Sequence, residues 1–167
     1  LLVLAHLQVH PDHLLEQAQQ PGAVRAASLE AAPQVRQVRD DTFADGVNLT
    51  NGSTGNHVTN IEARSTGDDS FALFAATDLN PGNQYDNVFE NLTALTPWRA
   101  AGLAVYGGYA NTFRNLYIAD TLTYSAITIS SLDFGYPFLG FGPQPTTVQN
   151  ASLVRDGGHF WGQQTFP

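Results

Sequence analysis

The chain has 167 residues, with 7 basic residues, all of them arginine, 15 acidic residues and no cysteine. This length is typical of one domain, and the lack of cysteine excludes a disulfide scaffold. A formal net charge of −8 excludes the basic surface that nucleic-acid binding requires, and no apolar run is long enough to span a membrane.

Residues 1–34 do not share the pattern of the rest of the chain. They are rich in Ala, Gln, Leu and His, and residues 14–20 are typical of a short helix between prolines. Three histidines have a spacing that would place them on one helical face, but a proline interrupts it, and we predict no metal site at His6, His10 and His13. We expect an atypical N-terminal segment over 1–34, either a cap or a disordered or foreign end, followed by a domain over 35–167. Because the chain does not begin with Met, we read that domain as truncated, a piece of a longer protein.

Two columns of apolar residues recur through the domain. The first column comprises Val47, Phe71, Leu103 and Ile127. The second comprises Leu49, Leu73, Val105 and Ile129, and its steps are equal except for a longer one from Leu73 to Val105. A recurrence of this kind, at about 20 to 50 residues, is typical of solenoids and other repeat architectures.

A second short strand with a central asparagine precedes each later copy of the repeat. These asparagines are Asn60, Asn91, Asn115 and Asn150. The segments lack helical periodicity and are separated by Gly, Asn, Asp and Thr turns. We predict an all-β fold, a right-handed parallel β-helix whose coils lie about 4.8 Å apart, with the asparagine amides stacked between coils. An antiparallel sandwich is the alternative.

Three aspartates stand at matching points of the repeat. When Leu49 is aligned with Leu73, Asp45 falls over Asp69, and Asp68 has no counterpart in the first copy. Stacked coils would therefore bring these carboxylates together. Adjacent strand residues point to opposite faces, so Asp68 and Asp69 share a face only if the chain bends, and Gly67 is suited to such a bend.

Clustered carboxylates suit acid–base chemistry. Glycoside hydrolysis uses one carboxyl group to protonate the leaving oxygen and another on the opposite face of the sugar. Neighbouring carboxylates push their pKa values apart, so that one stays protonated near neutral pH. Two other readings remain for the same residues: a simple turn and a calcium site.

The sequence around these acids resembles glycoside hydrolase family 87, the α-1,3-glucanases (mutanases) and mycodextranases. The resemblance lies in residues 41–49 (DTFADGVNL), 65–74 (STGDDSFALF), 102–108 and 132–138, and it covers roughly residues 35–166. It implies a secreted, extracellular β-helical polysaccharidase that hydrolyses with inversion. It also places the three catalytic aspartates of the family at Asp45, Asp68 and Asp69, and no cofactor is required.

The roles of the acids follow from the expected stacking and from a similar arrangement in polygalacturonase-type β-helix hydrolases. We assign Asp68 as the general acid, and Asp45 and Asp69 as the pair that activates water. Carboxyl groups about 6.5–9.5 Å apart across the bond would imply inversion.

Other residues are candidates for contact with sugar. Asn48 lies between two core-facing residues and should point outward beside Asp45, either to bond a hydroxyl or simply to face solvent. Arg99 would bond a hydroxyl, orient an acid or form a surface ion pair. We expect Trp98 to lie in the insert that makes one repeat longer than the others, and flat rings for stacking on sugars, or for ordinary packing, are Trp98, Tyr106, Tyr124 and Tyr136.

The excess of acidic over basic residues favours an uncharged binding partner. An anionic polysaccharide would favour Lys or Arg near the acids, so a neutral α-1,3-glucan is expected, bound by a monomer. The alternative function is a non-catalytic β-helix that binds polysaccharide or a cell surface, as adhesins do.

Overall fold

Strands make up all the regular structure of the described chain. The computed structural model describes residues 37–131, 133–157, 159–160 and 163–164, and these ranges contain no helix, and hence none that could cross a membrane. The predicted N-terminal segment and its boundary at residue 34 lie outside them. The strands are β1 (Gln37–Asp40), β2 (Val47–Thr50), β3 (His57–Arg64), β4 (Phe71–Phe74), β5 (Val88–Leu95), β6 (Leu103–Tyr106), β7 (Thr112–Ala119), β8 (Ile127–Ile129), β9 (Thr147–Val154), β10 (His159–Phe160) and β11 (Gln163–Gln164).

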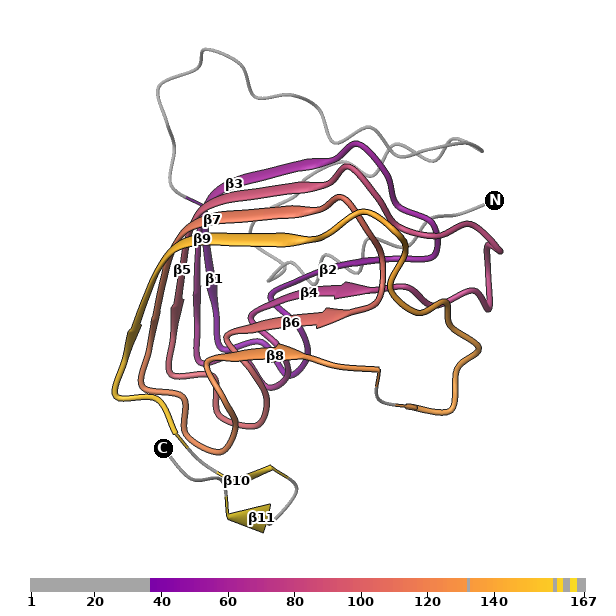
Figure 1. Ribbon diagram of the computed structural model, residues 1–167. Coiled ribbons are helices and arrows are strands. Elements are labelled where there is room, and N and C mark those ends of the chain that lie inside the picture. Colours follow the sequence, from indigo (N-terminus) through magenta and orange to yellow (C-terminus); the bar gives the residue numbers. More distant parts are fainter. Residues whose placement is uncertain (1–36, 132, 158, 161–162, 165–167) are drawn as a thin grey trace.

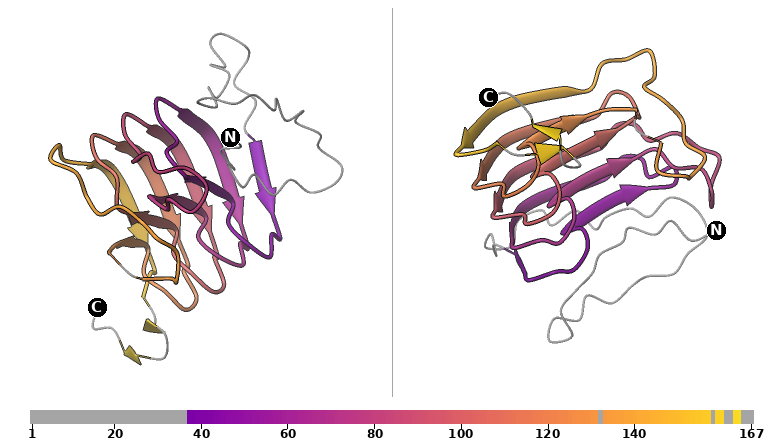
Figure 2. Two further views of the ribbon diagram at one scale, coloured as in Figure 1. Left: turned by 90° about the vertical axis from the view of Figure 1, so that its right-hand side faces the viewer. Right: turned by 90° about the horizontal axis from the view of Figure 1, so that it is seen from below.

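The strands alternate between two parallel sheets. The order is β1-β3-β5-β7-β9 in one sheet and β2-β4-β6-β8 in the other, so each turn of the chain adds one strand to each sheet (Figure 1). Seen from the side, the coils lie in a regular stack (Figure 2). The fold is a parallel β-helix, as predicted. The antiparallel sandwich is wrong, because every ladder between these nine strands is parallel.

The two predicted apolar columns form one wall of the core. Their members are paired in register from β2 through β4 and β6 to β8. Side chains of the other sheet meet them inside the solenoid, where the rings of Phe89 and Phe113 stack with centroids 4.7 Å apart. The recurrence of the columns thus reflects one coil per repeat.

The long step of the apolar columns, from Leu73 to Val105, has a different origin from the one predicted. The β4–β5 connection covers residues 75–87, whereas the β2–β3 connection covers only 51–56 and the β6–β7 connection only 107–111. The extra length therefore lies at residues 75–87. Placing Trp98 in an insert was wrong, because its β5–β6 connection, 96–102, is no longer than the equivalent β7–β8 connection, 120–126.

The predicted asparagine ladder marks a corner of the solenoid. Asn60, Asn91, Asn115 and Asn150 have φ angles of 52–59°, a left-handed conformation that Asn tolerates better than most residues. The amide nitrogens of Asn91, Asn115 and Asn150 each donate to the asparagine side-chain oxygen of the preceding coil, at 3.2, 3.0 and 3.1 Å. The ladder bends β3, β5, β7 and β9 and ties successive coils together.

A second asparagine ladder, not predicted from the sequence, lies inside the molecule. The amide of Asn56 donates to Asn87 Oδ1 at 2.8 Å, and that of Asn87 donates to Asn111 Oδ1 at 3.0 Å. The same oxygens accept the backbone N–H groups of Asn56 and Asn87. All three side chains are buried. The polar groups of the turns before β3, β5 and β7 thus find hydrogen-bond partners inside the molecule, as buried polar groups require.

The core positions of the last coil are the most exposed. Ile129 is 59% exposed, although its partner Val105 on β6 is fully buried, and Leu153 is exposed although its partner Ile118 is buried. Beyond them, β10 and β11 pair antiparallel, apart from the two main sheets. The coils before the last one, which include those that carry the three acids, are therefore better packed.

Candidate active site

The three predicted acids meet at the edge of the sheet β2-β4-β6-β8. Asp45 and Asp69 each stand two residues before their strand, and the β2–β4 register places them one coil apart. The N–H of Gly46 donates to the carbonyl of Asp69 at 3.0 Å, which fixes this stacking. Asp45, Asp68 and Asp69 each contribute one oxygen to a group whose members all lie within 4.8 Å of one another. The predicted carboxylate cluster is confirmed.

The separation is smaller than expected. Oxygens within 4.8 Å of one another are closer than the roughly 6.5–9.5 Å at which two carboxyl groups typically flank a bond in inverting enzymes. The spacing of the acids therefore does not by itself support inversion.

Asp68 occupies a bend that brings it beside Asp69. The chain turns at Gly67 and Asp68, but Gly67 does not have the positive φ of a left-handed residue. A β-carbon at Gly67 would lie 2.6 Å from both the carbonyl oxygen of Phe43 and an indole carbon of Trp98. Glycine is needed here for close packing between coils. Asp68 stays partly exposed and accepts a hydrogen bond from Arg99 at 2.5 Å.

The other two acids are held by different donors. Asn48, which faces away from the core as predicted, donates to Asp45 Oδ2 at 2.7 Å. Asp69 is buried and accepts the backbone N–H of Ala101, on the next coil, at 2.8 Å. Asn48 therefore orients an acid in this structure, and Ala101 is a site residue that no side-chain motif could have revealed.

The environment of Asp69 favours its neutral form. Burial, and then the charge of Asp45, raise its pKa well above the ordinary value of 3.8, and Asp68 adds to the rise. The N–H of Ala101 and a weaker interaction with Tyr106 oppose the shift without cancelling it. Burial also raises the pKa of the Tyr106 hydroxyl, so that group stays protonated. The cluster thus retains a proton over a wider pH range than an exposed aspartate does.

A calcium ion fits this arrangement poorly. The oxygens are close enough to share a cation, and calcium takes six to eight oxygen ligands. The guanidinium of Arg99, however, already binds Asp68 Oδ2 and places a positive charge beside the cluster. The donor set therefore suits proton chemistry better than calcium binding.

The predicted aromatic contacts divide into two groups. Trp98 and Tyr136 are 41% and 52% exposed and remain accessible to solvent. Tyr106 and Tyr124 are each only 6% exposed, because they pack over the small side chains of the sheet's outer face at Ala72, Ala101 and Ala104. For Tyr106 and Tyr124 the structure matches the alternative of ordinary packing, since both side chains are buried.

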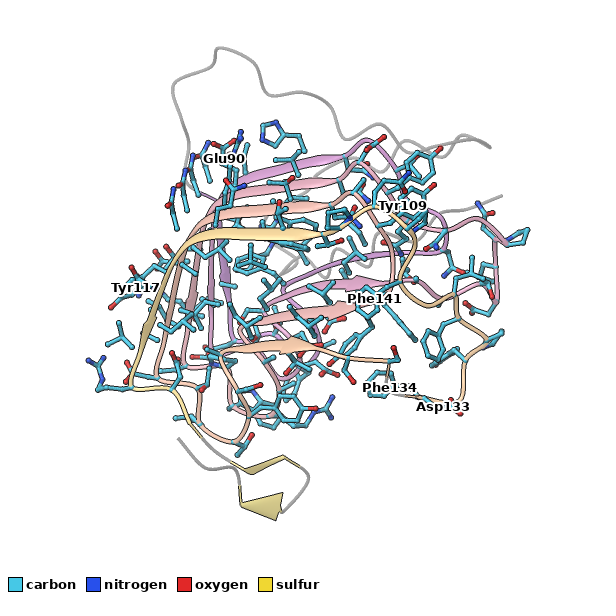
Figure 3. All side chains as sticks on the ribbon, in the orientation of Figure 1. Glu90, Tyr109, Tyr117, Asp133, Phe134 and Phe141 are labelled. Carbon is cyan, nitrogen blue, oxygen red and sulfur yellow. The ribbon has the colours of Figure 1, made fainter. Side chains whose placement is uncertain are left out.

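A cluster of aromatic rings beyond the acids was missed. Phe74, at the end of β4, meets Phe134, Tyr136 and Phe138 with ring centroids 5.7–6.2 Å away. The segment that carries these rings folds back on the solenoid (Figure 3), because the N–H of Leu139 donates to the carbonyl of Ala75 at 2.9 Å. The dense aromatic run at 134–141 was the available signal in the sequence.

The similarity to known proteins is concentrated in one family. Residues 26–166 match the model of the alpha-1,3-glucanase catalytic domain D2. The chain belongs to glycoside hydrolase family 87. No curated protein sequence matches it.

Solved structures of family 87 catalytic domains are similar in fold and sequence. Three are single aspartate-to-alanine variants of an alpha-1,3-glucanase. One, in complex with tetrasaccharides, has a TM-score of 0.73 and 56% identity over 75% of this chain. A second, also in complex with tetrasaccharides, has a TM-score of 0.70 and 55% identity over 74% of this chain. A third, in complex with nigerose, has a TM-score of 0.68 and 55% identity over 74% of this chain. The chain spans 22% of the length of these family 87 structures.

Proposed function

We propose that this protein hydrolyses the α-1,3-glucosidic bonds of a neutral α-glucan, with inversion, using Asp45, Asp68 and Asp69. The observation that carries the proposal is the cluster of three carboxylates, two of them reached by solvent. The order of the acids along the chain supports the assignment. In the family 87 variants, two of the substituted aspartates are adjacent, and the third precedes them by the same offset that separates Asp45 from Asp68 and Asp69.

The three acids divide the chemistry between them. Burial favours the neutral form of Asp69, the innermost of the three. Asp68 is partly exposed at a bend, and it donates a proton to the glycosidic oxygen as the bond from that oxygen to the sugar's anomeric carbon breaks. Asp45 and Asp69 hold a water between adjacent coils, and its oxygen bonds to the anomeric carbon while its proton passes to Asp45.

The charge of the site suits an uncharged substrate. The acids lie in a chain with a net charge of −8, and the cation beside them, Arg99, is already paired with Asp68. An anionic sugar would be repelled here. A glucan polymer does not cross membranes, so we propose that the enzyme acts outside the cell; its recovery from cells and not from culture medium would contradict this.

The first test measures new reducing ends after incubation with α-1,3-glucan. Asp68→Asn should abolish their release while the circular dichroism spectrum is unchanged. Asp78→Asn, a substitution of an exposed aspartate in the β4–β5 connection, is the matched control and should keep full activity. Comparable release by Asp68→Asn would refute the acid assignment. Binding of glucan without any release by the unsubstituted protein would favour the polysaccharide-binding alternative.

The second test follows stereochemistry. Inversion at an α-linkage releases a β-anomer first, because water attacks from the face opposite the leaving group. Proton NMR within the first minutes of reaction separates the anomers before they interconvert. An α-anomer as the first product would contradict the water-activation scheme.

A further inference from the structure

One segment of the solenoid, residues 97–101, lies against the bend that carries Asp68. The N–H of Trp98 donates to the carbonyl of Thr66 at 3.0 Å, and the N–H of Gly67 donates to the carbonyl of Thr42 at 2.7 Å. The bend is thus tied to the coils on both sides. The indole of Trp98 also covers Gly67 so closely that no β-carbon would fit between them. The bend has little room to move while Trp98 is in place.

The same segment provides a different donor for each of two adjacent acids. Arg99 binds Asp68 through its guanidinium, and Ala101 binds Asp69 through its backbone N–H. The Arg99–Asp68 pair is solvent-exposed, with side-chain exposures of 57% and 39%. Pairs of this kind contribute only about 0–1 kcal/mol to stability, so stability alone is a weak reason for an arginine at this position.

We propose that Trp98 and Arg99 are positioning residues for Asp68: Trp98 holds the bend, and Arg99 fixes the orientation of the carboxyl group. This inference rests on the proposed function. Arg99 binds Oδ2, which leaves Oδ1 to carry the proton toward the sugar. As that proton leaves, the carboxylate becomes negative, and the guanidinium stabilises it more strongly than before. An interaction that strengthens in the transition state raises kcat and leaves substrate binding nearly unchanged.

The kinetic test substitutes the two residues and separates kcat from KM. Arg99→Ala should lower kcat about 10- to 100-fold, the loss expected when a catalytic group is displaced by about 1 Å, with little change in KM. Guanidinium ion added at low millimolar concentration should restore part of the loss. Arg114→Ala removes an exposed, ion-paired arginine on the other sheet and should change neither constant. An unchanged kcat in Arg99→Ala, or a rise in KM alone in Trp98→Ala, would overturn the proposal.

A second measurement does not depend on activity. Hydrogen exchange should be faster at the amides of Gly67 and Ser70 in Trp98→Ala than in the unsubstituted protein, because both amides bond across coils at this bend. Trp98→Phe should retain most of the protection, and Arg114→Ala all of it. Unchanged protection in Trp98→Ala would sink the role of Trp98 even if the protein hydrolysed no glucan. Conversely, an inactive protein with faster exchange in that variant would refute the proposed function and leave the packing role standing.

Discussion

Two of the side-chain stacks that run between coils of this solenoid, the outer asparagines and the aspartates, behave in opposite ways. The outer asparagine ladder extends over four coils, with each amide donating to the one before it. The aspartate stack contains only Asp45 and Asp69, with Asp68 beside them. An amide has both donors and acceptors, whereas a carboxylate only accepts. Stacking identical residues therefore stabilises the asparagine ladder, whereas it places like charges side by side in the aspartate stack.

The residues that continue each stack show the difference. The asparagine column extends to the last long strand, but the column of Asp45 and Asp69 continues as Ala101 and then Ser125. Ala101 provides a backbone N–H to the acid of the preceding coil, and Arg99 provides a charge. The same register that stacks the asparagines thus also stacks two carboxylates that repel one another, and the next coil offsets that repulsion with hydrogen-bond donors.

The largest expected effect, on hydrolysis, comes from replacing an aspartate of the acid stack with asparagine, the residue of the ladder. Asp45→Asn replaces a carboxylate with an amide of the same shape, so Asn48 can still form a hydrogen bond to it. Hydrolysis of α-1,3-glucan should fall about 10²- to 10⁴-fold, the usual contribution of a general acid or base. Reducing-end assays and thermal unfolding would check this. Full activity in a folded Asp45→Asn protein would remove Asp45 from the mechanism.

The buried asparagine ladder should be the most sensitive part of the structural framework. Asn87→Ala removes an amide that bonds to Asn111 and to the carbonyl of Ser53, and an oxygen that accepts from Asn56. Several buried polar groups would lose their partners, at a cost of about 3 kcal/mol in the free energy of unfolding. Urea titration measures this cost, and a loss below about 1 kcal/mol, the value of a single ordinary hydrogen bond, would show that the ladder is not needed.

The burial of Asp69 and its repulsion by Asp45 should make the free energy of unfolding depend on pH. The folded pKa of Asp69 lies above its unfolded value of about 3.8, so the folded state holds a proton that the unfolded state releases. The free energy of unfolding therefore falls as pH rises from the unfolded pKa through the folded pKa. Asp69→Asn should remove this fall and be more stable than the unsubstituted protein above that window. Parallel stability curves for the two proteins would contradict the raised pKa.

The exposed ladder should tolerate change best. Asn115→Ala removes two hydrogen bonds between solvent-exposed amides and places alanine at a φ of 57°, for a cost of about 1–2 kcal/mol. Asn115→Gly should cost less, because glycine adopts this conformation freely. Urea titration of both variants separates the hydrogen-bond and backbone contributions. Equal losses would show that conformation contributes nothing.

The features that depend on periodicity are predictable from the sequence. The apolar columns, the outer asparagine ladder and the meeting of Asp45 with Asp69 all follow from residues that recur at one offset. Features that depend on a neighbouring coil are missed or misplaced. The sequence leaves stacking on sugar and ordinary packing both open for Tyr106, and only the small side chains at Ala72 and Ala104 show that it packs against the sheet. Similarly, Gly67 is expected to permit a bend, and its packing partner Trp98 comes from the following coil.

The buried asparagines illustrate a further reason. Asn56, Asn87 and Asn111 stand in turns, where asparagine is common for purely local reasons. Only the three-dimensional structure reveals that their amides lie inside and bond from coil to coil. The aromatic run at 134–141 is visible in the sequence, but its return over β4 depends on backbone bonds to Ala75 and Thr77 that no local pattern encodes.

The longer connection between β4 and β5 has a consequence for remodelling the protein. Its additional residues leave the pairing of β4 with β6 unbroken, and Leu79 within it is held by the side chain of Asn51 in the turn of the first coil. The length of this connection can thus change without shifting the register of the strands. A designer could graft a longer or differently charged connection at residues 77–83 while the spacing of the acids is preserved.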